Sequence, residues 1–175
     1  RYGLAFRQGQ GCKWTARAHA GRVRDETCEI LSEPELTRID FHLNVSDHLL
    51  YTCRLVRKAY SSGLKIVCYS TRPEILEQLD KLLWTFSEED FLPHVVTGHP
   101  GLAETPIVLT DKADDIRHYD LLINLDEQWP PFFARFDRLV EIVGNDENNK
   151  AVARQRYKFY KERGYPLNTF DRAKG

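Results

Sequence analysis

The chain has 175 residues, of which 42% are hydrophobic and 29% are charged, and its net charge is −1. This composition fits one globular domain with a substantial core. The near-neutral charge excludes a global attraction to nucleic acid or membranes, and no apolar run reaches the roughly 18 residues of a membrane span or resembles a signal peptide. We therefore expect a cytoplasmic protein without a membrane contact.

Residues 1–36 contain glycine, arginine and cysteine without a sustained helical or strand period. Regular patterning begins at Thr37. We therefore expect residues 1–36 to be a disordered or non-native extension and residues 37–175 to form a single domain.

From residue 38 onward, short β-rich runs alternate with helical segments, which predicts an α/β fold with a mostly parallel sheet between helices. Strands are expected at residues 38–43, 64–70, 106–110, 120–125 and 138–143, and helices at residues 46–62, 71–84 and 146–163. Ser46 is the predicted cap of the first helix and Gly63 its end. A capping box is predicted at Thr71, with Pro73 in the first turn and Glu74 completing the box.

A nucleotide-binding enzyme is the natural alternative for such a sheet, and it needs a glycine-rich loop after the first strand. The segment that follows residues 38–43 is NVSDHLL, which has no glycine. Neither a GxxxxGK[ST] loop nor a GxSxG elbow occurs anywhere. We therefore assign no catalytic residue and no cofactor, and retain a nucleotide-dependent enzyme only as an alternative.

Metal-ligand spacing is also missing. The histidines of the predicted domain have none of the i, i+3 or i, i+4 pairs of a helix-borne metal site, and the four cysteines lie far apart. We expect structural or surface histidines, buried thiols at Cys53 and Cys68, and no metal.

The predicted C-terminal helix sorts its side chains by face when residues are placed at 100° intervals. One narrow stripe consists of Lys150, Arg154, Tyr157 and Lys161. Val152 and Phe159 point nearly opposite, toward the expected core. A tyrosine within a basic stripe suits a ligand that carries both acidic and aromatic groups.

Charge counting makes this helix a local exception. Residues 150–163 contain six cations and one anion, whereas residues 37–145 contain 11 cations and 17 anions, a net charge of −6. Anionic partners should therefore be steered to the helix. Two alternatives stay open: a solvated amphipathic helix without a ligand, and direct binding of nucleic acid, whose phosphates suit the same groups.

A second candidate surface is the segment LLWTFSEEDFLPHV, in which Trp84, Phe86, Phe91, Leu92 and Pro93 follow the second helix without a clean period. Such aromatic connections either plug the end of a core or form a protein-protein hot spot. The residues alone leave the two interpretations nearly even.

Several ordered sequence blocks resemble one family, the chi subunit of bacterial DNA polymerase III. The resemblance spans residues 37–171 and is carried by TRIDFH, LDKLLWTFSEEDFLPH, ETPIVL, DLLINL, FARFDRLVEIV and ARQRYKFYKERGYPL. It implies a Rossmann-like three-layer sandwich without enzymatic activity. It also implies an accessory subunit of the clamp loader that connects the psi subunit to single-stranded-DNA-binding protein, so that contact with DNA is mostly indirect.

The resemblance implies two binding surfaces. The pocket for the acidic C-terminal tail of single-stranded-DNA-binding protein corresponds here to Lys150, Arg154, Tyr157, Lys158, Lys161 and Val143. Lys161 stands where an arginine is familiar, which removes a bidentate donor. The psi-binding surface corresponds to Trp84, Phe91 and Pro93. Whether a helicase or repair partner also binds is left open.

Overall fold

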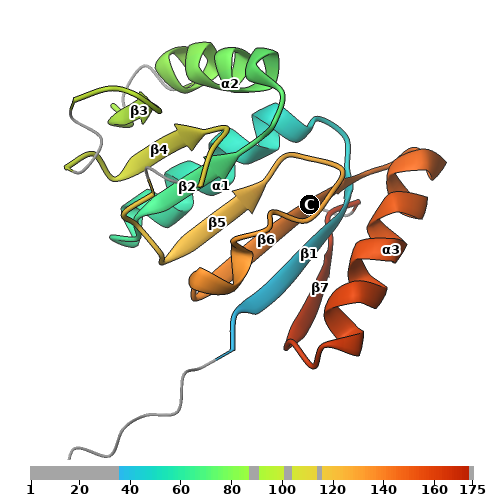
Figure 1. The fold of residues 1–175 in the computed structure, drawn as a ribbon. Helices are drawn as coiled ribbons and strands as arrows, with labels where there is room; N and C mark the ends of the chain where they lie inside the picture. Colours follow the sequence, from blue (N-terminus) through green and yellow to red (C-terminus); the bar gives the residue numbers. More distant parts are fainter. Residues whose placement is uncertain (1–35, 87–90, 101–103, 114–115, 174–175) are drawn as a thin grey trace, which may run out of the picture. The chain divides into compact units, whose positions relative to one another are not determined.

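The computed structural model describes residues 36–86, 91–100, 104–113 and 116–173. Within them, seven strands form one parallel sheet in the order β3-β4-β2-β5-β6-β1-β7 (Figure 1). The strands are β1 (Arg38–Val45), β2 (Ile66–Tyr69), β3 (His94–Val96), β4 (Ile107–Thr110), β5 (Leu121–Asn124), β6 (Arg138–Gly144) and β7 (Leu167–Asp171). The predicted α/β class with a parallel sheet is confirmed.

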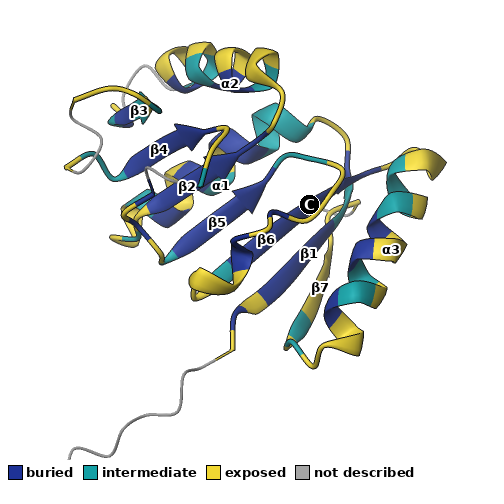
Figure 2. Cartoon of the chain, in the orientation of Figure 1, coloured by how far each residue is buried: buried dark blue, intermediate teal, exposed yellow. Residues whose placement is uncertain are grey.

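Helices cover both faces of this sheet, which gives the predicted three layers. The helices are α1 (His48–Ser61), α2 (Pro73–Thr85) and α3 (Glu147–Glu162), with a short 3-10 turn, η1 (Phe133–Arg135). Strand alternation separates two cores: Ile66 and Cys68 of β2 pack with α1 and α2, whereas Val67 and Tyr69 pack with α3 and η1. Figure 2 shows buried inner strands between helices whose outer faces are exposed.

The predicted thiols are confirmed, because Cys53 and Cys68 are buried and unpaired. Burial raises the pKa of the Cys53 thiol to about 11, so this group stays protonated at neutral pH. In the described part of the chain, no helix is long and apolar enough to cross a membrane, and no group of three or more His, Cys, Asp or Glu side chains could hold a metal ion.

Two predicted helix caps are wrong. The cap of α1 is Asp47 rather than Ser46, since the Asp47 carboxylate accepts a hydrogen bond from the Leu50 N–H at 2.9 Å. Thr71 does not cap α2, which begins after Arg72 without a side-chain cap. The expected end of α1 is confirmed, because Gly63 follows its last turn with a φ of +78°.

Strands β3 and β7, which are both edge strands, were not predicted. The first has only three residues, and β7 has the sequence LNTFD with four exposed positions. Edge strands pack against the sheet on one side only, so they lack the continuous apolar run that marks the inner strands.

The predicted inner face of α3 needs correction. Ala153, Arg156 and Tyr160 are the buried residues of this helix, while Val152 and Phe159 are only half-buried. Phe159 stacks on Trp129 at a centroid distance of 3.8 Å. The prediction that Arg156 is a surface cation is therefore wrong. The position of a residue on a helix does not show that a buried acidic side chain lies opposite it.

That acid is Glu141 of β6, which is fully buried. Its carboxylate accepts hydrogen bonds from Tyr160 Oη at 2.7 Å and Asn124 Nδ2 at 3.0 Å. Arg156 Nε lies 3.1 Å from Glu141 Oε2, an ion-pair distance without hydrogen-bond geometry. Burial raises the pKa of Glu141, and the Arg156 charge opposes that rise. The interaction therefore attaches α3 to the centre of the sheet.

We expect Arg156→Met to destabilise the fold by about 3–5 kcal/mol, because it leaves a buried carboxylate without its counter-ion. Urea unfolding measures this loss, with the exposed neighbour Gln155→Met as the control. Without Arg156 the folded-state pKa of Glu141 rises further above the unfolded value, so protonation favours the folded state. The deficit should therefore be smaller at pH 5 than at pH 8, and an equal deficit at both would contradict this account.

Candidate functional site

A pocket of about 370 Å³ lies at the carboxyl ends of β1 and β6, beside the first half of α3. Its floor and walls are largely apolar and come from Phe41, Leu43, Val143, Ala153 and Tyr157. The Tyr157 ring meets Phe41 edge to face at a centroid distance of 5.4 Å. The pocket can therefore take an apolar or aromatic group from a ligand.

Cations from α3 form the rim of this pocket. Lys150 and Arg154 line it, and both lie near the same carboxylate, Glu147. Lys150 Nζ is 3.3 Å from Glu147 Oε1, and Arg154 Nη2 is 3.8 Å from Glu147 Oε2. All three side chains reach solvent, so these ion pairs are weak and exchangeable. An incoming carboxylate can thus replace Glu147 at the rim.

The backbone of β1 is irregular beside the pocket, which Asn44 and Gly144 help to line. The pairing of β1 with β6 shifts register between His42 and Val45, and Asn44 adopts a left-handed φ of 59°. Asn44 Nδ2 donates to Asp171 Oδ1 at 2.8 Å, which attaches the bulge to β7. Opposite it, a Cβ on Gly144 would come within 2.8 Å of the His48 ring, so a side chain there would require His48 to move.

The structure brings together four of the six residues predicted for one binding site. Lys150, Arg154, Tyr157 and Val143 line the pocket, whereas Lys158 and Lys161 are exposed on α3 outside its lining. Lys158 Nζ lies 3.7 Å from Glu162 Oε1.

On the strand side of the pocket, sequence reasoning found Val143 but missed Phe41, Leu43 and Thr169. Alternation in RIDFHL places Phe41 and Leu43 on one face of a strand. Nothing in that pattern says that α3, more than 100 residues later, covers the same face.

The second predicted surface lies at the end of α2. Trp84 is 56% exposed and Phe91 is 67% exposed, and their ring centroids are 5.5 Å apart. Pro93 is half-buried beside them, while Leu92 points into the core. The middle of the predicted segment, residues 87–90, lies outside the described residues. Two adjacent exposed rings are more typical of a protein-binding surface than of a core plug.

The ring of Trp84 packs on buried residues of the domain. Trp84 packs on the buried His94 ring at a centroid distance of 4.8 Å. His94 Nδ1 bonds to the Leu92 carbonyl at 2.7 Å, and its Nε2 lies 3.3 Å from Asp80 Oδ1. The exposed aromatic pair thus rests on ordered residues, which reduces the side-chain entropy that Trp84 itself would lose when a partner binds.

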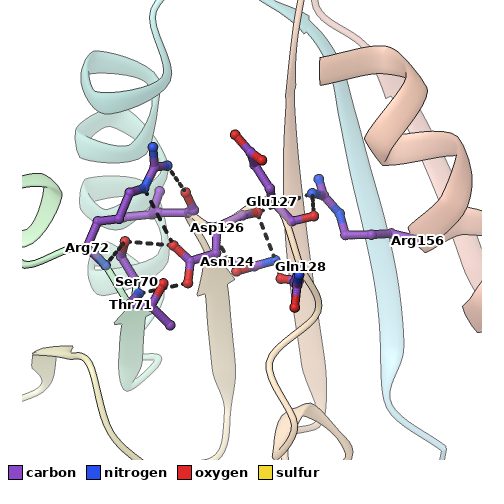
Figure 3. A network of polar contacts seen from close by, with 9 residues as sticks. Ser70, Thr71, Arg72, Asn124, Asp126, Glu127, Gln128 and Arg156 are labelled. Atoms are coloured by element: carbon purple, nitrogen blue, oxygen red, sulfur yellow. Dashed lines mark hydrogen bonds and ion pairs between the residues drawn. The ribbon is translucent and has the colours of Figure 1, made fainter. Parts of the chain in front are cut away.

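In many parallel sheets of this kind, nucleotides bind at the carboxyl ends of the central strands. Here the side chain of Asp126 lies at the carboxyl ends of β2 and β5 (Figure 3). Asp126 accepts hydrogen bonds from Ser70 Oγ at 2.8 Å and from the Thr71 N–H at 2.7 Å, and Arg72 Nε lies 3.9 Å away. A fixed carboxylate at the start of α2 repels phosphate. This arrangement disfavours the nucleotide-dependent alternative.

Comparison with known proteins assigns the family. Residues 36–168 match the family described as DNA polymerase III chi subunit, HolC. The chain is 35% identical over 136 residues to DNA polymerase III subunit chi of Pseudomonas aeruginosa, covering 75% of this chain and 94% of that protein. It is 30% identical to the same subunit of Haemophilus influenzae (67% and 82% covered) and of Escherichia coli (67% and 80% covered). The chain therefore belongs to the DNA polymerase III chi subunit family.

Proposed function

We propose that this chain is a non-catalytic accessory subunit of DNA polymerase III that binds the acidic C-terminal tail of single-stranded-DNA-binding protein. It would connect that tail, through the psi subunit, to the clamp loader. One observation carries the proposal: the pocket beside α3 combines an apolar floor with a rim of two cations. A peptide that ends in acidic residues and an aromatic ring has both complementary features.

The proposed binding mode follows from this lining. The terminal aromatic ring of the tail enters between Tyr157 and Val143, where it is removed from water. Its carboxylates meet Arg154 and Lys150, and the arginine offers the planar fork that matches a carboxylate.

Lys161 and Lys158 stand outside the pocket lining, so they act mainly on long-range attraction. The presence of lysine rather than arginine at position 161 then has little effect on the affinity for the tail peptide, because bidentate pairing matters only where a carboxylate is bound.

The first test is Arg154→Ala. We expect calorimetry with a synthetic acidic tail peptide to show a loss on the order of 2 kcal/mol, or about 30-fold in Kd, because a charge-assisted contact at the rim is removed. Lys158→Ala is the matched control, since it removes an equally exposed cation from the same helix outside the pocket. Unchanged affinity of the Arg154 variant would refute the assignment.

The second test concerns the competing carboxylate. Glu147 lies near both rim cations, so Glu147→Gln should increase the affinity for the tail peptide several-fold at low salt. The gain should shrink in 0.5 M NaCl because salt screens exposed charges. Glu162→Gln, which removes the partner of Lys158, should leave affinity nearly unchanged. Weaker binding of the Glu147 variant would count against the proposed docking of carboxylates.

The psi subunit would bind the surface formed by Trp84, Phe91 and Pro93. Phe91→Ala should abolish capture of psi in a pull-down with purified proteins, because Phe91 is the most exposed ring of the pair. The thermal midpoint and the tail-peptide affinity should stay at the parent values, since different elements form the two surfaces. Tyr119→Ala, at another exposed aromatic, is the control. Unfolding of the Phe91 variant would indicate a core role instead.

A further inference from the structure

A second pocket of about 370 Å³ lies beside α1, and four cations line it. Arg54 and Lys58 stand one turn apart on α1, Arg138 begins β6, and Arg172 follows β7. Its lining includes no acidic side chain from the part of the chain that the structure describes. The pocket is therefore strongly electropositive on a protein whose net charge is −1.

Within the described residues, an ion pair neutralises only one of these four cations. Arg138 forms an ion pair with the buried Asp40. Among the described residues, no carboxylate lies within ion-pair distance of Arg54, Lys58 or Arg172. Three unpaired cations around one hollow repel each other unless an anion enters it.

The base of the pocket offers a buried polar atom that has no partner. His42 is 3% exposed, and its Nδ1 meets Tyr51 Oη at 2.7 Å, while its Nε2 has no hydrogen-bond partner. Burial, helped by Arg172, lowers the pKa of His42 to about 4, so the ring is neutral at pH 7. When Tyr51 donates to Nδ1, Nε2 carries the proton and can donate to an anionic oxygen.

An aromatic ring completes the site. Phe170 of β7 lines the pocket, is 37% exposed and meets the His42 ring edge to face at a centroid distance of 5.2 Å. The guanidinium of Arg172 lies 5.4 Å from the Phe170 centroid. Proteins that bind single-stranded nucleic acids use such groups together. The cations contact the phosphates, and the aromatic ring stacks on a base.

We propose that this basic pocket binds the phosphodiester backbone of single-stranded nucleic acid, with one base against Phe170. Phosphates take the positions between Arg54, Lys58 and Arg172, and one oxygen accepts from His42 Nε2. A nucleic acid strand fits better than an acidic peptide, because the four cations come from three separate elements and can meet successive phosphates, whereas the pocket beside α3 has two cations on a single helix.

The two pockets open on opposite faces of the sheet. Successive residues of β1 point to opposite sides, so Phe41 and Leu43 line the pocket beside α3 while His42 lines the basic pocket. A protein tail and a nucleic acid strand can thus be bound at once. The proposed site for nucleic acid thus lies beside α1 and not on the basic stripe of α3.

The test uses the full chain and a fluorescently labelled 15-nucleotide oligothymidylate. Anisotropy at 50 mM NaCl should show about tenfold weaker binding for the double variant Arg54→Ala/Lys58→Ala, whose side chains are exposed and make no structural ion pair. A plot of log affinity against log salt concentration has a negative slope. Its magnitude should decrease by about 1.4 in the double variant, since each single-strand phosphate contact contributes about 0.7. Arg57→Ala on the same helix and Arg154→Ala beside α3 are controls that should keep parent affinity.

A second readout locates the ligand. In long-range ¹H–¹⁵N spectra, the His42 Nε2 resonance should shift when the oligonucleotide is added and should not shift with the acidic tail peptide. Parent-like affinity of the double variant, or an oligonucleotide complex in which His42 is unchanged, would overturn the proposal. So would a His42 shift that only the peptide produces. Loss of tail-peptide binding in the Arg154→Ala variant concerns only the pocket beside α3. It says nothing about oligonucleotide binding at the basic pocket.

Discussion

The buried contact between Glu141 and Arg156 is the interaction on which the rest of the structure depends. A carboxylate in the middle of a sheet is stable only when its charge and lone pairs are satisfied, and α3 supplies both Arg156 and Tyr160 for that purpose. The position and rotation of α3 follow from this requirement. Its opposite side then carries Lys150 and Arg154 to the rim of a pocket whose floor belongs to β1 and β6.

The same arginine extends the connection across the sheet. Arg156 Nη1 donates to the Glu127 carbonyl at 2.6 Å and to the Asp126 carbonyl at 3.2 Å, which fixes the loop after β5 (Figure 3). In that loop the Asp126 side chain accepts from Ser70 Oγ and from the Thr71 N–H, just before α2. A continuous polar path therefore joins α3 to α2, and it occupies the edge at which a related sheet would hold a nucleotide.

The edge strand β7 has a comparable part in the two pockets. Thr169 lines the pocket beside α3, while Phe170 and Arg172 line the basic pocket on the other face. Strand β7 pairs only with β1, and its consecutive residues point to opposite faces of the sheet. One strand therefore contributes side chains to both pockets. A short, polar edge strand thus contributes little to the core and much to the lining of the two pockets.

The amino-acid sequence by itself determined the α/β class, the five inner strands, the three helices and the two buried thiols. These features depend on local periodicity and on apolar runs that only a covered parallel sheet requires. It also singled out Lys150, Arg154 and Tyr157, because their spacing places them on one helical face. The tertiary structure decided that Asp47 rather than Ser46 caps α1 and that Arg156 is buried. It also decided which face of β1 completes each pocket. The burial of Arg156 and the faces of β1 depend on contacts between residues far apart in the chain, such as Phe41 with Tyr157, and such contacts leave no signal in the local sequence. The cap of α1 is a local contact, but Ser46 and Asp47 are both good capping residues, so sequence preference does not choose between them.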